Sequence, residues 1–142
     1  ESRMSSGPEN RFLQGVHRCL PASIYRMKNP NQYNAGIADC WYSGAAGDLW
    51  IEYKFTTPPK RPATIVDFCS GSDPLIKPLQ KQWLEDRHRE GRNVGVIIGT
   101  PAGGLWLPGI SWGGPLPAGE RFSKLLTKKE LAEIITRITS TQ

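Results

Sequence analysis

The spacing of hydrophobic residues predicts helices near both ends of the chain. Apolar residues recur every three or four positions over residues 8–20 and again over residues 128–138, a period typical of helices with one buried face. Pro8 suits the first turn of the earlier helix. Thr127 and Glu130 form a capping-box pattern at the start of the later helix.

The segments between these helices favour strands. Hydrophobic residues alternate or run together in five short segments, which we interpret as strands: residues 23–27, 37–43, 49–55, 94–98 and 103–107. A glycine-bounded turn over residues 44–48 predicts that the second and third of these strands form a hairpin. The ambiguous segment 64–68 is interpreted as one more short strand.

A third helix is expected over residues 77–89, with Leu79, Trp83 and Leu84 on its inner face. After the last strand, glycines and prolines predict a long loop that continues to Gly119. We expect Trp83 to join the core and Trp112, within this loop, to be exposed.

The order of these elements predicts the fold class. Helices and strands alternate within 142 residues, which indicates a single α/β domain with a mixed central β-sheet flanked by helices. We expect this domain to span residues 4–142, with Met4 as the natural start and residues 1–3 as a vector-encoded remnant.

Composition narrows the classes of function. Eighteen Lys and Arg against thirteen Asp and Glu give a net charge of +5, which mildly favours a polyanionic partner. No apolar run approaches the roughly 20 residues that span a bilayer, so we expect no role in a membrane. The three cysteines are widely spaced and odd in number, which favours free, mostly buried thiols in the cytoplasm over a disulfide framework.

Three ionisable residues are candidates for chemistry: Asp39, Glu52 and Lys54. Glu52 and Lys54 lie two positions apart in one predicted strand and therefore share a face. The predicted hairpin places Asp39 near their level. Two carboxylates can hold Mg²⁺ or Mn²⁺, and an ammonium beside them can act on a phosphate or an attacking water. An exposed Glu–Lys pair on a solvated strand is the alternative interpretation.

The same residues resemble the signature of the PD-(D/E)XK nucleases. Residues 36–39 read Gly-Ile-Ala-Asp, residues 51–54 read Ile-Glu-Tyr-Lys, and a glutamine-bearing helix and an apolar strand follow. Within that superfamily the pattern is most similar to the virus-type replication-repair nuclease (VRR-NUC) group, with Holliday-junction resolvases as relatives. Ala38 stands where that group usually has proline. The resemblance covers residues 9 to about 100 and implies a restriction-endonuclease-like core.

The resemblance implies roles for individual residues. Asp39 and Glu52 would be metal ligands, and Lys54 the catalytic lysine. Gln80 matches the glutamine of the supporting helix and is included in the catalytic set, with Gln82 as the alternative if the helix register differs.

Two further metal ligands follow from the same resemblance: Glu9 on the first helix and the backbone carbonyl of Tyr53. A glutamate in a first helical turn is also favoured by the helix dipole alone, so Glu9 has a second explanation. Asp48, four residues before Glu52, is the alternative to Asp39.

Basic residues near this signature are candidates for contacts with DNA phosphates. Lys60 and Arg61 lie on a proline-rich loop, and Lys77 and Lys81 lie on the third predicted helix. Phosphate contacts of this kind give affinity without sequence readout.

The resemblance implies an Mg²⁺- or Mn²⁺-dependent DNA endonuclease, with branched DNA such as a junction or flap, or single-stranded DNA, as the candidate substrates. The resemblance also implies a homodimer, because related resolvases pair to cut both strands. It implies a phage-type role in replication, repair or recombination in the cytoplasm of an infected bacterium. The alternative is a non-catalytic nucleic-acid-binding module that retains the nuclease fold.

Overall fold

The computed structural model describes residues 7–29 and 36–140, and the predicted alternation of helices and strands is present there. In chain order the elements are α1 (Pro8–Arg18), β1 (Tyr25–Lys28), β2 (Cys40–Gly44), β3 (Gly47–Phe55), β4 (Ile65–Val66), α2 (Pro78–Arg89), β5 (Val94–Thr100), β6 (Gly103–Pro108), β7 (Leu116–Pro117), α3 (Ala118–Arg121) and α4 (Lys128–Ser140). Met4 and residues 1–3, for which we expected a natural start and a remnant, lie outside the described ranges, as does most of the loop before Gly36.

Within the described ranges, the central sheet has the strand order β1-β2-β3-β5-β6. β3 and β5 are parallel, whereas the other neighbours are antiparallel. Parallel neighbours need a long crossover, and here the chain from β3 to β5 passes through α2. The predicted mixed sheet flanked by helices is therefore present.

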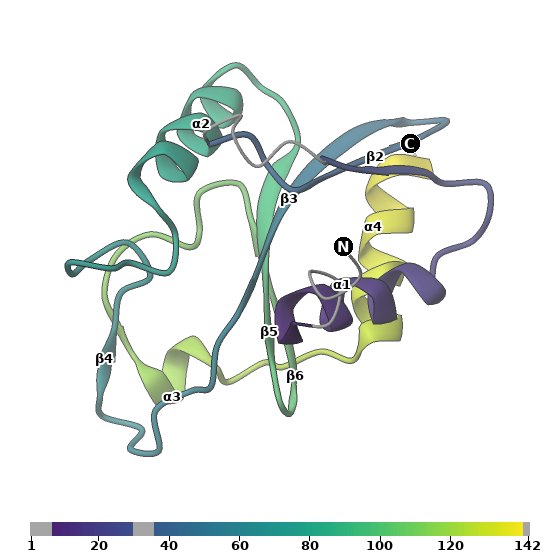
Figure 1. Cartoon of the computed structure of the whole chain (residues 1–142). Helices are drawn as coiled ribbons and strands as arrows, with labels where there is room; N and C mark the ends of the chain where they lie inside the picture. Colours follow the sequence, from purple (N-terminus) through teal and green to yellow (C-terminus); the bar gives the residue numbers. More distant parts are fainter. Residues whose placement is uncertain (1–6, 30–35, 141–142) are drawn as a thin grey trace.

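Helices cover both faces of this sheet (Figure 1). α1 and α4 pack together on one face, where α4 contacts β2, β3 and β6, and α2 packs over β5. The core under α1 and α4 includes Phe12, Ile51 and Ile135, and a second cluster includes Leu84 and Val96. Full burial of such side chains contributes about 1.5–3 kcal/mol each, so both layers hold the sheet in place.

The β2–β3 hairpin sets the level of the predicted site residues. Gly44 pairs with Gly47, so the turn is tighter than the expected 44–48 segment. At the other end, Cys40 pairs with Ile51. Because the strands are antiparallel, Asp39, one residue before Cys40, lies level with Glu52.

The glycine- and proline-rich segment after β6 is more ordered than predicted. It contains β7, which pairs with β4 in a separate two-stranded sheet, and the short helix α3. Trp112, expected to be exposed, is 1% exposed, and its indole N–H donates to the Gly109 carbonyl at 2.8 Å. The prediction was wrong because the loop folds back onto the second hydrophobic cluster, which local composition does not reveal.

The inner face of α2 also differs from the prediction. Leu84 is buried as expected, but Leu79 is 60% exposed. Trp83, expected in the core, is half-buried at the end of a row of aromatic rings. The row crosses the sheet from β1 to α2, with ring-centroid separations of 5.4, 6.2 and 5.4 Å between Tyr25, Trp41, Trp50 and Trp83.

The start of α4 and the free state of the cysteines agree with the prediction, but the expectation that most of the thiols are buried was wrong. Thr127 and Glu130 form the expected capping box, with reciprocal hydrogen bonds of 2.8 and 3.0 Å. Cys19, Cys40 and Cys69 are free, but Cys40 alone of these three is buried. Across the described ranges, no helix combines the length and the apolar character needed to cross a membrane.

Candidate active site

β3 carries the centre of the site because its side chains alternate between the two faces of the sheet. Ile51 and Tyr53 point into the core beneath α1 and α4. Glu52 and Lys54 therefore point to the opposite face, on the side of α2. Glu52 is 1% exposed, which is unusual for a carboxylate. Burial removes the carboxylate from water, so it needs hydrogen-bond or ion-pair partners that offset the free energy of desolvation.

One oxygen of Glu52 has two such partners. The Lys54 Nζ lies 3.3 Å from Glu52 Oε2, and the Gln80 Nε2 donates to the same oxygen at 3.0 Å. The other end of the Gln80 amide accepts the Lys77 backbone N–H at 3.0 Å. This second bond orients the amide so that its NH₂ group faces Glu52.

The two glutamines of α2 have different environments. Gln80 contacts Glu52 across the interface between α2 and β3. Gln82 is exposed and donates to Asp86 on the same helix at 2.9 Å. The structure thus brings Gln80, and not the alternative Gln82, to the predicted site.

Asp39 lies at the same level, as the hairpin register requires. Its Oδ2 accepts the backbone N–H of Tyr53 at 3.0 Å. This bond occupies the edge of β3 just beyond the start of β2 at Cys40. The N–H and C=O of one residue in an extended strand face the same edge, so the Tyr53 carbonyl faces the side on which Asp39 lies.

The second oxygen of Glu52 has no partner. Oε1 is buried and accepts no hydrogen bond in the described structure. Burial raises the pKa of Glu52 well above its ordinary value, the Asp39 carboxylate raises it further, and Lys54 opposes both effects. An orphaned buried oxygen beside a second carboxylate is the environment in which a cation would stabilise the ionised form.

These donors fit a hard divalent cation. Mg²⁺ and Mn²⁺ prefer carboxylate and carbonyl oxygens, and Asp39, Glu52 and the Tyr53 carbonyl offer that set. Among the described residues, no group of three or more His, Cys, Asp or Glu side chains could hold a metal ion. With two carboxylates and one carbonyl as protein ligands, a bound Mg²⁺ would keep several waters, as it usually does.

The structure separates the remaining acidic candidates. Glu9, in the first turn of α1, has its pKa raised by burial and then by Asp39, and lowered by Lys54, so it lies within electrostatic range of the site. It does not join Asp39 and Glu52 in a three-carboxylate group. Asp48, the alternative to Asp39, lies at the hairpin end and accepts the Ser43 hydroxyl at 2.8 Å.

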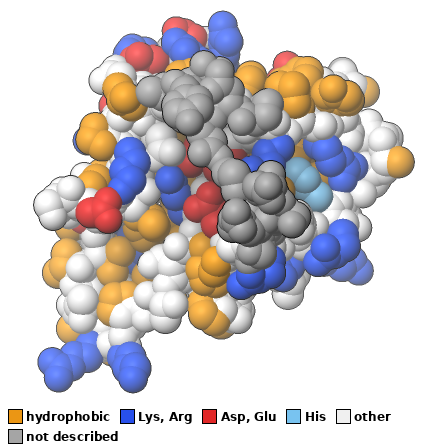
Figure 2. Space-filling view, in the orientation of Figure 1, with side chains coloured by type: hydrophobic (Ala, Val, Ile, Leu, Met, Phe, Trp, Pro, Cys, Tyr) orange, Lys and Arg blue, Asp and Glu red, His pale blue; other side chains and the backbone are white. Residues whose placement is uncertain are grey.

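The four basic candidates occupy two different places. Lys60 and Arg61 are exposed on the loop between β3 and β4, which reaches the lower tip of the molecule in Figure 1. Lys77 and Lys81 are exposed at the start of α2, beside Gln80, and Lys77 forms an ion pair with Asp73. In Figure 2, basic and acidic side chains also lie next to each other near the middle of the same face.

A buried polar chain beneath the site was not predicted. The His17 Nε2 and the Tyr42 hydroxyl are 2.7 Å apart, and the Tyr42 and Tyr53 hydroxyls are also 2.7 Å apart. Burial lowers the pKa of His17 to about 4, with smaller effects from Arg26 and Lys28. These hydrogen bonds connect α1 to β2, which begins one residue after Asp39, and to β3, which carries Glu52. Strand alternation places Tyr53 on the face opposite Glu52 and Lys54, but no sequence signal linked Tyr42 and Tyr53 to His17.

Comparisons with known proteins support the fold. No family model matches the sequence, and no curated protein matches it. A solved structure of similar fold is that of Archaeoglobus fulgidus Hjc, a Holliday junction resolvase from an archaeal hyperthermophile. The match has a TM-score of 0.53 at 12% identity and covers 89% of this chain and 97% of that chain. The single domain, with its mixed sheet flanked by helices, therefore has the restriction-endonuclease-like arrangement of that protein.

Proposed function

We propose that this protein is a nuclease of the PD-(D/E)XK superfamily that hydrolyses phosphodiester bonds in DNA with the help of Mg²⁺ or Mn²⁺. The observation that carries the proposal is the environment of Glu52: a buried carboxylate with Lys54 and Gln80 on one oxygen and no partner on the other. The arrangement shared with Hjc supports it, because that protein is a junction resolvase.

Each residue of the site has a separate task in this proposal. Asp39, Glu52 Oε1 and the Tyr53 carbonyl would hold the cation. When bound, the cation would polarise the phosphate and lower the pKa of an attacking water. The Lys54 ammonium, which lies 3.3 Å from Glu52, orients that water or neutralises charge that develops on the phosphate. Gln80 holds the Glu52 carboxylate in one orientation.

The finer features of the proposal concern substrate and setting. We propose selectivity for branched or single-stranded DNA, with phosphate contacts from Lys60, Arg61, Lys77 and Lys81, and Glu9 as an additional acidic group at the site. The proposed setting is the cytoplasm of a phage-infected bacterium, where a homodimer of the VRR-NUC type would act in replication, repair or recombination. The net charge of +5 suits a polyanionic substrate.

A cleavage assay tests the proposal. The purified protein is incubated with Mn²⁺ and with junction, flap, single-stranded and duplex DNA of one sequence. We expect cleavage that EDTA abolishes and that Glu52→Gln and Lys54→Ala each lower by at least about 100-fold. Asp48→Asn is the matched control, because Asp48 lies at the hairpin end away from Glu52. Full activity in folded Glu52→Gln would refute the proposal, and binding without cleavage in any divalent metal would support the non-catalytic alternative.

A further inference from the structure

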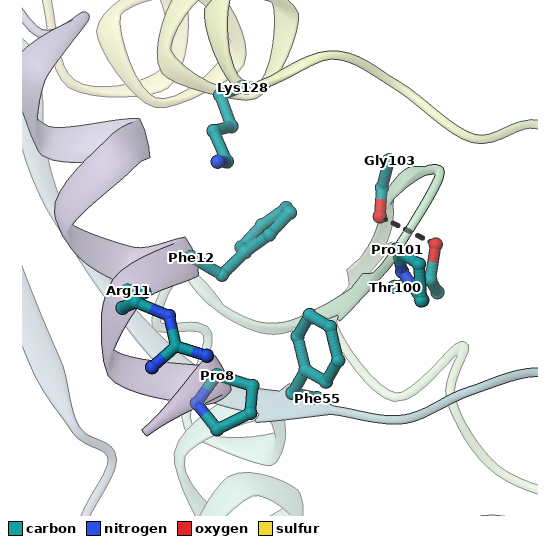
Figure 3. Close-up of a pocket in the computed structure, with 8 residues that line it drawn as sticks. All are labelled: Pro8, Arg11, Phe12, Phe55, Thr100, Pro101, Gly103 and Lys128. Atoms are coloured by element: carbon teal, nitrogen blue, oxygen red, sulfur yellow. Dashed lines mark hydrogen bonds between the residues drawn. The ribbon is translucent and has the colours of Figure 1, made fainter. Parts of the chain in front are cut away.

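An open pocket lies on the other side of β3 from Glu52 and Lys54. It has a volume of about 400 Å³ and lies between the first turns of α1 and α4 and the turn between β5 and β6. Figure 3 shows Arg11 and Lys128 on two sides of the Phe12 ring, with Phe55 beyond Phe12 and near Pro8. Pro8 closes the edge beside Arg11.

The charges of this pocket all have one sign. Arg11 and Lys128 are exposed, and neither forms an ion pair with any of the residues that the structure describes. No Asp or Glu lines the pocket. The Lys128 ammonium lies 5.4 Å from the centre of the Phe12 ring, which keeps it over the aromatic wall. Two uncompensated cations beside a concave surface attract an anion.

The apolar part of the pocket suits a flat or ring-shaped group. The Phe12 and Phe55 rings meet edge to face with centroids 6.4 Å apart. Phe12 is buried, whereas Phe55 is half-buried and presents part of its ring to the pocket. Aromatic and proline surfaces with nearby cations are the pattern that binds unpaired nucleotides, because any base has a face that stacks and a phosphate that pairs with Arg or Lys.

Two of the chain segments that line the pocket, β3 and the first turn of α1, also carry residues of the proposed site. Phe55 directly follows Lys54 in β3. Pro8 and Arg11 flank Glu9, whose pKa responds to Asp39 and Lys54. Lys54 and Phe55 are adjacent in β3 and point to opposite faces of the sheet, so the pocket begins one residue beyond the proposed catalytic lysine.

We infer that the pocket binds one unpaired nucleotide of the DNA strand beside the bond that is cut, with its phosphate between Arg11 and Lys128 and its base against Phe55 and Pro8. The inference rests on the proposed nuclease function and names its substrate more closely. A base enters a concave pocket only when it is not stacked in a duplex, so the pocket provides selectivity for frayed, flapped or single-stranded DNA without base-specific contacts.

Binding measurements in EDTA separate the pocket from the metal site. The probes are a fluorescein-labelled single strand of about 12 nucleotides and the blunt duplex of the same sequence. We expect Arg11→Ala/Lys128→Ala to weaken binding of the single strand at least about tenfold, and to reduce the slope of log K against log salt by about 1.4. Binding of the blunt duplex should change no more than in the control.

The control is Arg18→Ala/Lys129→Ala, which removes the same charge from exposed positions on the same two helices. Phe55→Leu separates the contribution of stacking from that of charge. This variant, checked for folding by its melting temperature, should bind the single-stranded probe several-fold more weakly than the wild type. The inference is overturned if the Arg11/Lys128 variant binds both probes with the same affinity as the control variant. It is also overturned if the substitutions reduce the affinity for the single strand and for the duplex equally.

The outcome is distinguishable from failure of the nuclease proposal. If the wild-type protein binds single strands through Arg11 and Lys128 but cleaves no DNA with Mn²⁺, the inference about the pocket is supported and the nuclease proposal is refuted. If it cleaves DNA and the Arg11/Lys128 variant retains full binding and full preference for unpaired DNA, the pocket inference alone fails.

Discussion

Gln80 Nε2 lies 3.0 Å from Glu52 Oε2, although the two residues are 28 positions apart in the sequence. The bond joins the first turn of α2 to the middle of β3. The Lys77 N–H holds the opposite end of the same amide at 3.0 Å, so the N-terminus of the helix determines which way the amide points. The orientation of the Glu52 carboxylate thus depends on how α2 is seated on the sheet.

Removing this amide should impair the site without unfolding the protein. Partners that orient a metal-binding group typically change metal affinity or activity by about 10–100-fold when they are lost. We therefore expect Gln80→Ala to lower cleavage in Mn²⁺ by about that factor, measured as initial rate under saturating DNA. Gln82→Ala is the matched control, since Gln82 donates to Asp86 on the exposed face of the same helix. Equal rates for the two variants would contradict a positioning role for Gln80.

Divalent metal should stabilise the folded protein. A ligand that binds the folded state alone raises stability by RT ln(1 + [L]/Kd), or about 2.7 kcal/mol when its concentration is 100 times Kd. We expect Mn²⁺ to raise the Tm of the wild-type protein but not that of Asp39→Asn or Glu52→Gln. Differential scanning calorimetry in Mn²⁺ and in EDTA measures the shift. An equal shift in the wild type and both variants would place the metal elsewhere.

Stability without metal should depend on pH through Glu52. Burial, and then the neighbouring Asp39, raise the pKa of Glu52 above its ordinary value of 4.5. Folding therefore favours the protonated form, and this contribution is lost as the pH rises through the raised pKa. In EDTA, the Tm of the wild type should fall relative to that of Glu52→Gln as the pH rises above 4.5. Parallel Tm curves for the two proteins would show that Glu52 does not carry this dependence.

His17 should produce a dependence of the opposite sign. Burial lowers the pKa of His17 from 6.5 to about 4, so the folded state favours the neutral ring. The stabilising contribution is complete above pH 6.5 and is lost as the pH falls toward 4. Over that range, the free energy of unfolding should decrease less in His17→Gln than in the wild type, as measured by urea denaturation. Arg18→Gln, one position along α1, is the control and should follow the wild type.

A side chain at Gly36 should disturb the contact between α2 and the segment that leads to Asp39. Gly36 has φ of +86°, and an added Cβ would overlap the Leu79 carbonyl, next to Gln80. Gly71 has a similar φ of +92° but open space around its Cβ position. Gly71→Ala should lower the free energy of unfolding by about 1–2 kcal/mol through backbone strain alone. Gly36→Ala should lower the free energy of unfolding by more than this and should also lower the cleavage rate. Equal losses of stability in the two variants would show that the contact with α2 adjusts without an energetic penalty.

The features that local pattern encodes were predictable. The period of apolar residues placed α1 and α4, and the Thr127–Glu130 box marked the start of α4. Strand alternation placed Glu52 and Lys54 together, because that geometry belongs to any extended strand. These predictions succeeded because each depends on residues within one turn or one strand of each other.

Predictions that needed a packing partner were less successful. Leu79 belongs to an apolar residue type but remains exposed, whereas Trp112 lies in a glycine-rich loop but is buried. Whether an apolar side chain is buried depends on where distant segments of the chain pack. The residues next to Leu79 in the sequence therefore do not reveal that it is 60% exposed.

By itself, the sequence determined the order of the three long helices and of the strands in the central sheet, the mixed character of that sheet, and the pairing of an acid with a lysine on one strand face. The tertiary structure alone decided that Gln80 rather than Gln82 reaches Glu52, and that Arg11 and Lys128 share one pocket. The physical reason is the sequence separation over which each effect acts, because backbone periodicity depends only on residues a few positions apart. Side-chain contacts between α2 and β3, or between α1 and α4, depend on how whole elements pack.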